Sequence, residues 1–181
     1  QICSLIFALM RMRAIIVPLS EEVELSKIEE FKTISGVEFL ISFDSKNKII
    51  VSKQKKIKEP KLISNFKIKK HPGLVVFTSG STGRPKGILH DCEQVMHKFI
   101  GKRNGWRTVL FLLIDHFGGF NTLLSSFAYG GTAICISDRK PDTICEVIEK
   151  TRATLLPTTP TFINILIASR SYLKYDLSSI K

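Results

Sequence analysis

The chain has 181 residues, carries a formal net charge of +11, and is 44% hydrophobic. This length is enough for one packed core, and the apolar fraction is ordinary for a globular protein, so the composition argues against a disordered chain. The apolar run at residues 2–10 is too short for a membrane span, and it lacks a start methionine and a small-residue cleavage site, so a signal peptide is not indicated. We expect this run to be the end of a buried helix.

Apolar runs alternate with helical patterns along the first part of the chain. Residues 15–19 are typical of a strand, residues 21–33 of a helix, and residues 37–43 of the next strand. This alternation predicts an α/β fold with a mostly parallel sheet and flanking crossover helices.

A lysine-rich segment then interrupts the alternation. Residues 46–70 contain ten lysines and one glutamate, which account for most of the net charge. Such a run can attract nucleic acid or an acidic membrane surface, but no aromatic stacking series or nucleic-acid motif accompanies it. We therefore interpret residues 44–71 as a solvated basic linker or a variable insertion, and expect no nucleic-acid partner.

A loop rich in glycine and hydroxyl groups follows a predicted strand at residues 74–78. Residues 78–87 read Thr-Ser-Gly-Ser-Thr-Gly-Arg-Pro-Lys-Gly. Glycines can take positive φ and let backbone N–H groups converge on an anion, while Lys86 adds a mobile positive charge suited to a polyphosphate. The loop is thus predicted to bind phosphate, with ATP as the ligand. The predicted ATP-binding residues are Thr78, Ser79, Gly80, Ser81, Thr82, Gly83, Lys86 and Gly87.

Two other known loop patterns do not fit. The P-loop pattern Gly-x-x-x-x-Gly-Lys-Ser/Thr needs a hydroxyl residue after the lysine, whereas Lys86 is followed by glycine and isoleucine. The nucleophile elbow Gly-x-Ser-x-Gly of serine hydrolases needs a glycine where Ser79 stands. We expect the loop to join a strand to a helix at residues 93–101.

The alternation of strands and helices resumes after the loop. The expected strands are residues 108–114, 132–137 and 154–158, and the expected helices are residues 120–129, 142–152 and 160–169. In the last of these helices, one face predicts core residues at Phe162, Ile163, Leu166 and Ile167.

The cysteines and histidines form no metal-ligand pattern. The sequence has no Cys-x-x-Cys pair and no His-Glu-x-x-His cluster. We expect reduced, buried thiols in a cytoplasmic protein and no metal held by these side chains. His71 and His97 are interpreted as structural or surface residues, and His90 as a residue that could line the edge of the loop. His116 follows a predicted strand, where ligands of open α/β sheets bind.

Residues 78–87 resemble the signature loop of the adenylate-forming enzymes, a family of acyl- and aryl-CoA synthetases, peptide-synthetase adenylation domains and luciferases. The family's loop reads Thr-Ser-Gly-Ser/Thr-Thr-Gly-x-Pro-Lys-Gly, and all ten positions match. A weaker resemblance to other family segments extends over four further stretches of the chain, one before the loop and three after it: residues 14–19, 112–119, 129–136 and 153–167. The resemblance implies the large N-terminal domain of this fold, with residues 72–181 as its nucleotide-loop and acyl-pocket part.

The resemblance also implies a reaction. The loop would hold the β- and γ-phosphates of ATP while a substrate carboxylate attacks the α-phosphorus, which gives an acyl-adenylate and pyrophosphate. A thiol, usually that of coenzyme A, would then take the acyl group, and Mg²⁺ is expected with the nucleotide. By the same resemblance Lys86 and Thr82 are the expected catalytic residues, and His116 and Gly118 are expected to line the acyl pocket.

Several family segments have no counterpart in residues 1–181. These are the Tyr-Gly-x-Thr-Glu segment, the Tyr-x-Thr-Gly-Asp segment, and the small C-terminal domain with its catalytic lysine. We expect the chain to be an internal fragment of a longer protein, inactive alone. The segment around Asp115 and His116 is more similar to the CoA ligases than to amino-acid adenylation domains. Two alternatives stay open: an amino-acid adenylation domain, and a truncated or inactive protein that binds nucleotide without turning it over.

Overall fold

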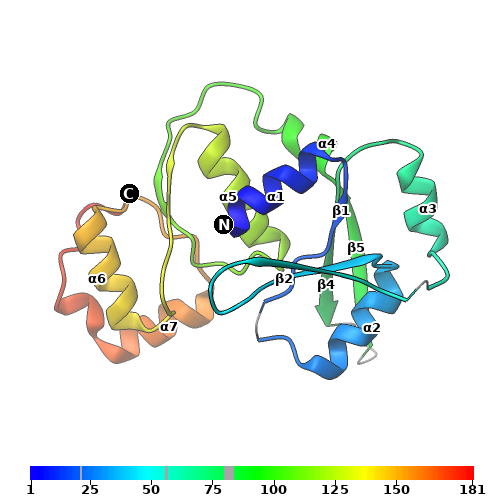
Figure 1. Ribbon diagram of the computed structural model, residues 1–181. Helices are drawn as coiled ribbons and strands as arrows, with labels where there is room; N and C mark the ends of the chain where they lie inside the picture. Colours follow the sequence, from blue (N-terminus) through cyan, green and yellow to red (C-terminus); the bar gives the residue numbers. More distant parts are fainter. Residues whose placement is uncertain (21, 56, 80–83) are drawn as a thin grey trace. The chain divides into compact units, whose positions relative to one another are not determined.

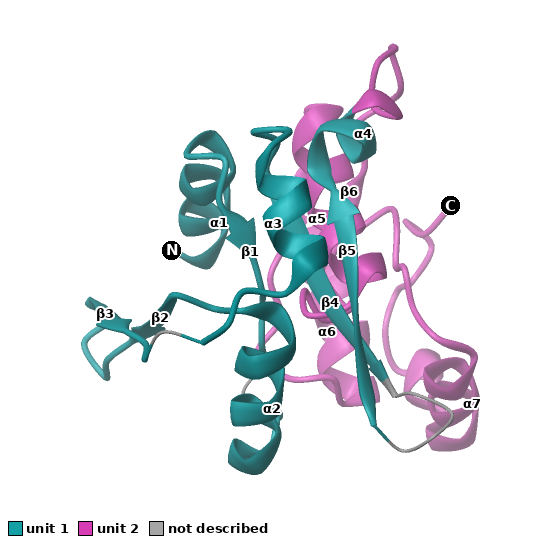
Figure 2. Cartoon of the chain, turned by 90° about the vertical axis from the view of Figure 1, so that its right-hand side faces the viewer, with its two compact units in different colours: residues 1–96 teal, residues 97–181 magenta. Residues whose placement is uncertain are grey.

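The computed structural model describes residues 1–20, 22–55, 57–79 and 84–181 (Figure 1). The chain folds into two compact units, residues 1–96 and residues 97–181 (Figure 2). The predicted nucleotide-loop and acyl-pocket part, residues 72–181, therefore contributes to both units. The α/β class with flanking helices is confirmed, but the sheets are only partly parallel, because two of the strand pairs are antiparallel.

Unit 1 is built on a sheet in which β4 lies between a parallel neighbour, β1, and an antiparallel neighbour, β5. Its strands are β1 (Ile15–Ile16), β2 (Phe39–Phe43), β3 (Ile49–Lys53), β4 (Gly73–Ser79) and β5 (Pro85–Asp91). Its helices are α1 (Ile2–Arg11), α2 (Leu25–Ser35), α3 (Lys61–Lys67) and α4 (Cys92–His97), the last of which ends at the boundary of the unit.

The segment directly after the glycine-rich loop is a strand that was not predicted, β5, and the helix predicted at residues 93–101 follows it as the shorter α4. β5 pairs antiparallel with β4 along its whole length, from Gly73 opposite Asp91 to Ser79 opposite Pro85. Pro85 is tolerated because it is the first residue of its strand and an outer strand of the sheet needs fewer backbone donors. The loop therefore connects the two strands of a hairpin, and α4 begins only after that hairpin closes.

The core of unit 1 lies between the sheet and its helices. β4 is the most deeply buried strand, because Leu74, Val75 and Val76 are each no more than 3% exposed. α2 covers the hairpin through Phe31, whose ring stacks on that of Phe77 with 3.9 Å between the centroids. Figure 1 shows α2 beside the β4–β5 pair.

The N-terminal helix is less buried than its composition suggests. α1 forms at residues 2–11, but only Ile6 in it is buried, so the expectation of a buried helix is wrong. The helix is amphipathic, and it packs against its unit on one face only. Neither α1 nor any other helix in the described residues is long and apolar enough to cross a membrane.

The lysine-rich segment at residues 44–71 contains a strand, β3, and a helix, α3, that were not predicted because of its many charged residues. β3 pairs antiparallel with β2, and the turn between them is held by Asp44, whose carboxylate accepts hydrogen bonds from the backbone N–H groups of Lys46 and Lys48. α3 buries Ile63 and Phe66 in the core. The segment is therefore not a solvated connection throughout, and its interpretation as a variable insertion stays a prediction.

Unit 2 has a small parallel sheet covered by helices. Its elements are β6 (Arg107–Val109), α5 (Phe117–Ala128), β7 (Thr132–Ile134), α6 (Pro141–Thr151), α7 (Pro160–Ser169) and a short 3₁₀ helix, η1 (Ser171–Leu173). β6 and β7 are parallel neighbours, and the strand predicted at residues 154–158 is reduced to one parallel bridge between Thr108 and Leu155. The buried core comprises Val109, Phe111, Ile134, Ile144, Ile148, Ala153 and Phe162.

The last two helices begin and end at recognisable signals. α6 and α7 each start with a proline in the first turn, and each stops before an arginine in the left-handed conformation, Arg152 or Arg170. The helix predicted at residues 160–169 is confirmed. Its predicted core face is wrong in part, because Phe162 is buried whereas Ile163 and Ile167 are 39% and 57% exposed.

The four cysteines are free thiols, and the expectation that all are buried is confirmed for Cys92 and Cys145 but wrong for the exposed Cys135 and the partly buried Cys3. Burial raises the pKa of Cys92 to about 11 and also raises the pKa of Cys145, which keeps both thiols protonated at neutral pH.

We expect a thiol reagent at neutral pH to modify Cys135 in the folded protein, and Cys92 and Cys145 only after unfolding. Mass spectrometry of the labelled peptides measures this, and fast labelling of Cys92 in the native state would contradict it.

Candidate functional site

The described flanks of the glycine-rich loop place Lys86 beside Thr78. These two residues are directly opposite in the β4–β5 register, so their side chains leave the same face of the hairpin, and both are exposed. Arg84, immediately before β5, is exposed as well. Ser79 ends β4, while four of the predicted ATP-binding residues lie outside the described residues, and their roles stay predictions. These four are Gly80, Ser81, Thr82 and Gly83.

The ammonium group of Lys86 is available to a ligand. No carboxylate in the described part of the chain forms an ion pair with Lys86, in contrast to Lys67, which pairs with Glu38 and Glu59. An uncompensated cation at the base of a loop rich in backbone N–H groups and hydroxyls attracts polyanions. The outer face of the hairpin is therefore suited to phosphate.

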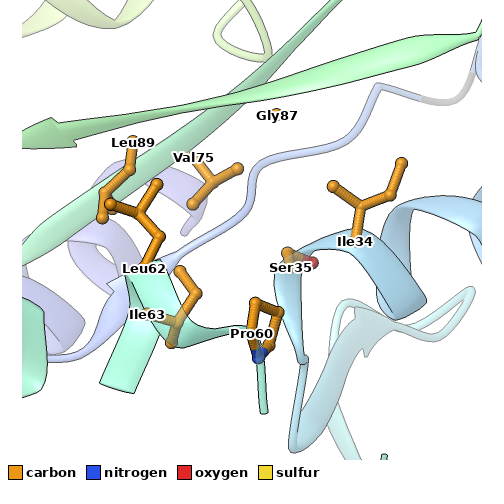
Figure 3. A pocket seen from close by; sticks show the side chains of 8 residues that line it. All are labelled: Ile34, Ser35, Pro60, Leu62, Ile63, Val75, Gly87 and Leu89. Carbon is orange, nitrogen blue, oxygen red and sulfur yellow. The ribbon is translucent and has the colours of Figure 1, made fainter. Parts of the chain in front are cut away.

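Gly87 has a structural role that the sequence did not show. It lies in β5 opposite Phe77, and its φ is not positive, so conformational freedom does not explain the glycine. A Cβ there would lie 3.2 Å from Ile34 Cγ2 and 3.3 Å from both Phe77 Cε1 and Val75 Cγ1. Figure 3 shows Gly87 on the hairpin beside Val75, with Ile34 of α2 nearby. Successive residues of a strand face opposite sides, so the side chain of Lys86 leaves the other face. The glycine lets α2 approach the hairpin, and its predicted contact with ATP stays a prediction.

We expect Gly87→Ala to lower the free energy of unfolding by about 1 kcal/mol, because each crowded neighbour must shift by a few tenths of an ångström. Chemical denaturation followed by circular dichroism measures the change. Lys86→Ala is the matched control, since Lys86 is the adjacent residue on the exposed face of the same strand. Equal stability of Gly87→Ala and the native protein would show that α2 tolerates the methyl group.

The inner face of the hairpin encloses a cavity that is too small for a nucleotide. Its volume is about 40 Å³, whereas pockets for small ligands occupy roughly 300–1,000 Å³. Residues of α2, α3 and the hairpin line it (Figure 3): Ile34, Ser35, Pro60, Leu62, Ile63, Val75, Gly87 and Leu89. This cavity is therefore not a nucleotide site, and binding on the outer face, where Thr78 and Lys86 lie, stays a prediction.

At the far end of the hairpin, His71 has a structural partner, as expected. Its Nδ1 lies 3.0 Å from both carboxylate oxygens of Asp91, and Lys69 Nζ lies 3.5 Å from the same carboxylate. Burial is the largest single effect and raises the pKa of Asp91. The hydrogen bonds from His71 and the Gln94 backbone, with the charges of His71 and Lys69, together outweigh it, so the pKa is lowered. Asp91 is thus a carboxylate that fastens the end of β5 to the segment before β4.

The predicted acyl-pocket residues lie together at the start of α5 in unit 2. His116 is the N-cap residue of α5, and its side chain is 68% exposed. Its Nδ1 lies 2.7 Å from Oδ1 of Asp115, whose side chain is only 9% exposed. Gly118 is in the first turn of α5, where a Cβ would meet only Leu112 Cδ1, at 3.4 Å. Lys86 belongs to unit 1, so a site that combines it with His116 stays a prediction.

Asp115 is a candidate site residue that the sequence reasoning did not select. The signal was present, because a carboxylate directly before a histidine can orient the ring. Within the described ranges, no group of three or more His, Cys, Asp or Glu side chains could hold a metal ion. Mg²⁺ that arrives with a nucleotide is held mostly by phosphate oxygens and water, and the hydroxyls and cations of the loop fit such a nucleotide.

The comparisons with known proteins agree with the family that the loop sequence resembles. The family described as AMP-binding enzyme matches residues 1–181. A carboxylic acid reductase of Mycobacterium tuberculosis is 33% identical over 103 residues, which cover 52% of this chain and 9% of the reductase. A 4-chlorobenzoate–CoA ligase of Arthrobacter sp is 30% identical over 118 residues, which cover 60% of this chain and 23% of the ligase. The chain thus matches less than a quarter of the length of these relatives.

Two solved structures have the same fold. The N-terminal domain of FACL13 from Mycobacterium tuberculosis matches 98% of this chain and 51% of its own, with a TM-score of 0.70 and 14% identity. The o-succinylbenzoate CoA synthetase MenE from Bacillus subtilis, in complex with an acyl-adenylate intermediate, matches 92% of this chain and 48% of its own, with a TM-score of 0.68 and 16% identity. Since the family match covers every residue and the fold agrees, the chain belongs to the family of AMP-binding enzymes.

Proposed function

We propose that the whole protein uses ATP to convert a carboxylic acid to an acyl-adenylate and then transfers the acyl group to the thiol of coenzyme A. The observation that carries the proposal is the exposed pair of Thr78 and Lys86 at the base of a loop that matches the signature of the adenylate-forming enzymes. The proposal concerns the whole protein, because the curated relatives are several times longer than the segments they share with this chain.

The residues of the loop suit the first step. A carboxylate oxygen attacks the α-phosphorus, the bond to pyrophosphate breaks, and negative charge increases on the phosphoryl oxygens. Lys86 and the hydroxyl of Thr82 would stabilise that charge in the transition state, with no proton transfer required. The remaining loop residues would position the β- and γ-phosphates and the Mg²⁺ bound to them: Thr78, Ser79, Gly80, Ser81, Gly83 and Gly87.

An aromatic carboxylic acid is the substrate class we propose. Two of the relatives are CoA ligases named for aromatic acids, 4-chlorobenzoate and 2-succinylbenzoate. His116 would present its exposed ring to such an acid, and Gly118 would leave space beside it. ATP and coenzyme A are supplied in the cytoplasm, where free thiols such as those of this chain persist, so we place the enzyme there.

Pyrophosphate exchange with the full-length protein tests the proposal. The assay contains ATP, Mg²⁺ and one acid at a time: 4-chlorobenzoate, 2-succinylbenzoate, a long-chain fatty acid, or an amino acid. Exchange with the aromatic acids supports the proposal, and a following assay with coenzyme A tests the thioester step. Exchange with amino acids alone would identify an amino-acid adenylation domain. Nucleotide binding without exchange would identify a non-catalytic nucleotide-binding protein.

A further inference from the structure

Asp115 and His116 form a pair in which one side chain is buried and the other faces solvent. The carboxylate of Asp115 is 9% exposed and the ring of His116 is 68% exposed, and 2.7 Å separates Oδ1 from Nδ1. The backbone fixes His116, since its N–H donates to the carbonyl of Leu113 and its carbonyl accepts a hydrogen bond from the N–H of Phe120. The pair thus sits in a defined turn at the N-terminal end of α5.

The carboxylate determines which nitrogen of the ring carries the proton. With the Asp115 carboxylate ionised, which the inference requires, its oxygens can only accept hydrogen bonds, so Nδ1 of His116 is the donor. In the neutral ring the proton therefore lies on Nδ1, and Nε2 has a lone pair. Because the His116 side chain is largely exposed, Nε2 is free to accept a proton from a ligand.

We propose that His116 is a proton acceptor for the thiol in the second half of the reaction, and that Asp115 is its positioning residue. The inference rests on the proposed function, because that reaction supplies the acyl-adenylate and the thiol. As the sulfur attacks the acyl carbon, the S–H bond breaks and its proton goes to Nε2 of His116. The new C–S bond forms, the bond between the acyl carbon and the AMP oxygen breaks, and AMP leaves. The imidazolium, held by the Asp115 carboxylate, then returns its proton to water.

The chemistry of the acceptor explains why a base is useful at this step and not before. A free thiol has a pKa of about 8.5, so most of it is protonated and weakly nucleophilic near neutral pH. The carboxylate that attacks ATP is already ionised and needs no base. A proton acceptor at the acyl pocket would therefore accelerate thioester formation and leave adenylation unchanged.

The matched variants are His116→Phe and Asp115→Asn, with Asp138→Asn as a control at another aspartate of the same unit. Phenylalanine keeps an aromatic wall and removes the proton acceptor, and at an exposed position it should not affect folding. Asparagine can donate to Nδ1, which places the ring proton on Nε2 and converts the outward nitrogen from acceptor to donor. Asp138 accepts a hydrogen bond from the backbone N–H of Lys140 and does not contact His116.

The experiment uses the full-length protein and compares two acceptors. Hydroxylamine captures the acyl-adenylate without a protein base and reports adenylation, whereas coenzyme A reports the thiol step. We expect His116→Phe and Asp115→Asn to lower the ratio of the thioester rate to the hydroxamate rate on the order of 10²-fold or more. An effect of the pocket wall on adenylation enters both rates and cancels in this ratio. Asp138→Asn should change neither rate. Equal ratios for His116→Phe and the native enzyme would overturn the inference, because a pocket wall alone would then be sufficient.

A second measurement does not depend on activity. Nitrogen-15 NMR of histidine-labelled protein, with His116 assigned by its substitution, shows which ring nitrogen carries the proton. We expect the proton on Nδ1 in the native protein and on Nε2 in Asp115→Asn. A native ring with its proton on Nε2 would overturn the inference even in an active enzyme. Failure of pyrophosphate exchange with every acid would instead overturn the proposed function, and the inference with it.

Discussion

Lys86→Ala in the full-length protein is expected to slow acyl-adenylate formation on the order of 10²–10³-fold, the usual loss when one preorganised donor to a transition-state charge is removed. Lys86 is exposed as the second residue of β5, opposite Thr78, and has no ion pair in the described residues. Its charge is therefore available to the phosphoryl oxygens that become more negative as pyrophosphate leaves.

The free energy of unfolding should not change in this variant. The side chain is exposed and forms no ion pair within the described residues, so its removal costs the folded state little. Pyrophosphate exchange and denaturant unfolding, measured on the same preparation, separate the two effects. Lys61→Ala is the control, because Lys61 is another exposed lysine of unit 1 outside the hairpin. Unchanged exchange in Lys86→Ala would remove this lysine from the mechanism.

Lys86→Arg refines the interpretation. Arginine keeps the charge but presents a planar fork in place of a compact ammonium group. Recovery of most of the exchange rate would mean that charge alone matters at this position. A loss as large as that of Lys86→Ala would mean that the phosphates require the shape and reach of lysine, as expected for a group that contacts the reacting atoms.

The sequence was most informative where local chemistry decides the structure. The loop at residues 78–87 was identifiable because all ten successive positions match the signature of the adenylate-forming enzymes. The ends of α6 and α7 were close to their predicted places because proline in the first turn is a strong local signal.

Tertiary contacts decided the features that were missed. β5 was not predicted because Pro85 and Gly87 are poor strand residues, yet seven residue pairs with β4 compensate for them. In β3, the run Ile49 to Val51 was overlooked between lysines, although pairing with β2 makes it a strand. In α7, Phe162 and Ile163 are both apolar, but they point about 100° apart on a helix, so only one of them can face the core.

The pair of Asp115 and His116 at the start of α5 shows a third limit of prediction from sequence. The sequence places Asp115 next to His116, but adjacency alone does not set the exposure of the two side chains. The turn before α5 buries the carboxylate of Asp115 and exposes the ring of His116. Because of this difference, the carboxylate can hold the ring from the inside while the ring faces a ligand in solvent. That turn depends in its own right on a close approach of two backbone segments at Gly119.

Gly119→Ala is expected to lower the free energy of unfolding by about 3 kcal/mol or more, at or beyond the usual range for overpacking. A Cβ at this position would lie 2.0 Å from the carbonyl oxygen of Leu113 and 2.6 Å from that of Leu112. These are backbone atoms, so no rotation of a side chain relieves the clash. Either the turn that carries Asp115 and His116 or the first turn of α5 has to move.

Gly118→Ala is the matched control for this prediction. Its Cβ would meet only a side-chain methyl group of Leu112, at 3.4 Å, and alanine favours a helix over glycine by roughly 0.5–1 kcal/mol. Stability should therefore stay the same or rise. The single tryptophan, Trp106, lies in unit 2, so its fluorescence during urea unfolding reports on the unit that contains both glycines.

The two glycines then separate packing from substrate binding. Equal stability of the Gly118→Ala and Gly119→Ala proteins would contradict the close approach of α5 to the turn. If Gly119→Ala unfolds easily while Gly118→Ala is stable but exchanges pyrophosphate poorly with bulky acids only, Gly119 holds the turn and Gly118 provides room for the acyl group. Because both substitutions add one methyl group to neighbouring positions of the same helix, the difference between them can come only from what each methyl group meets.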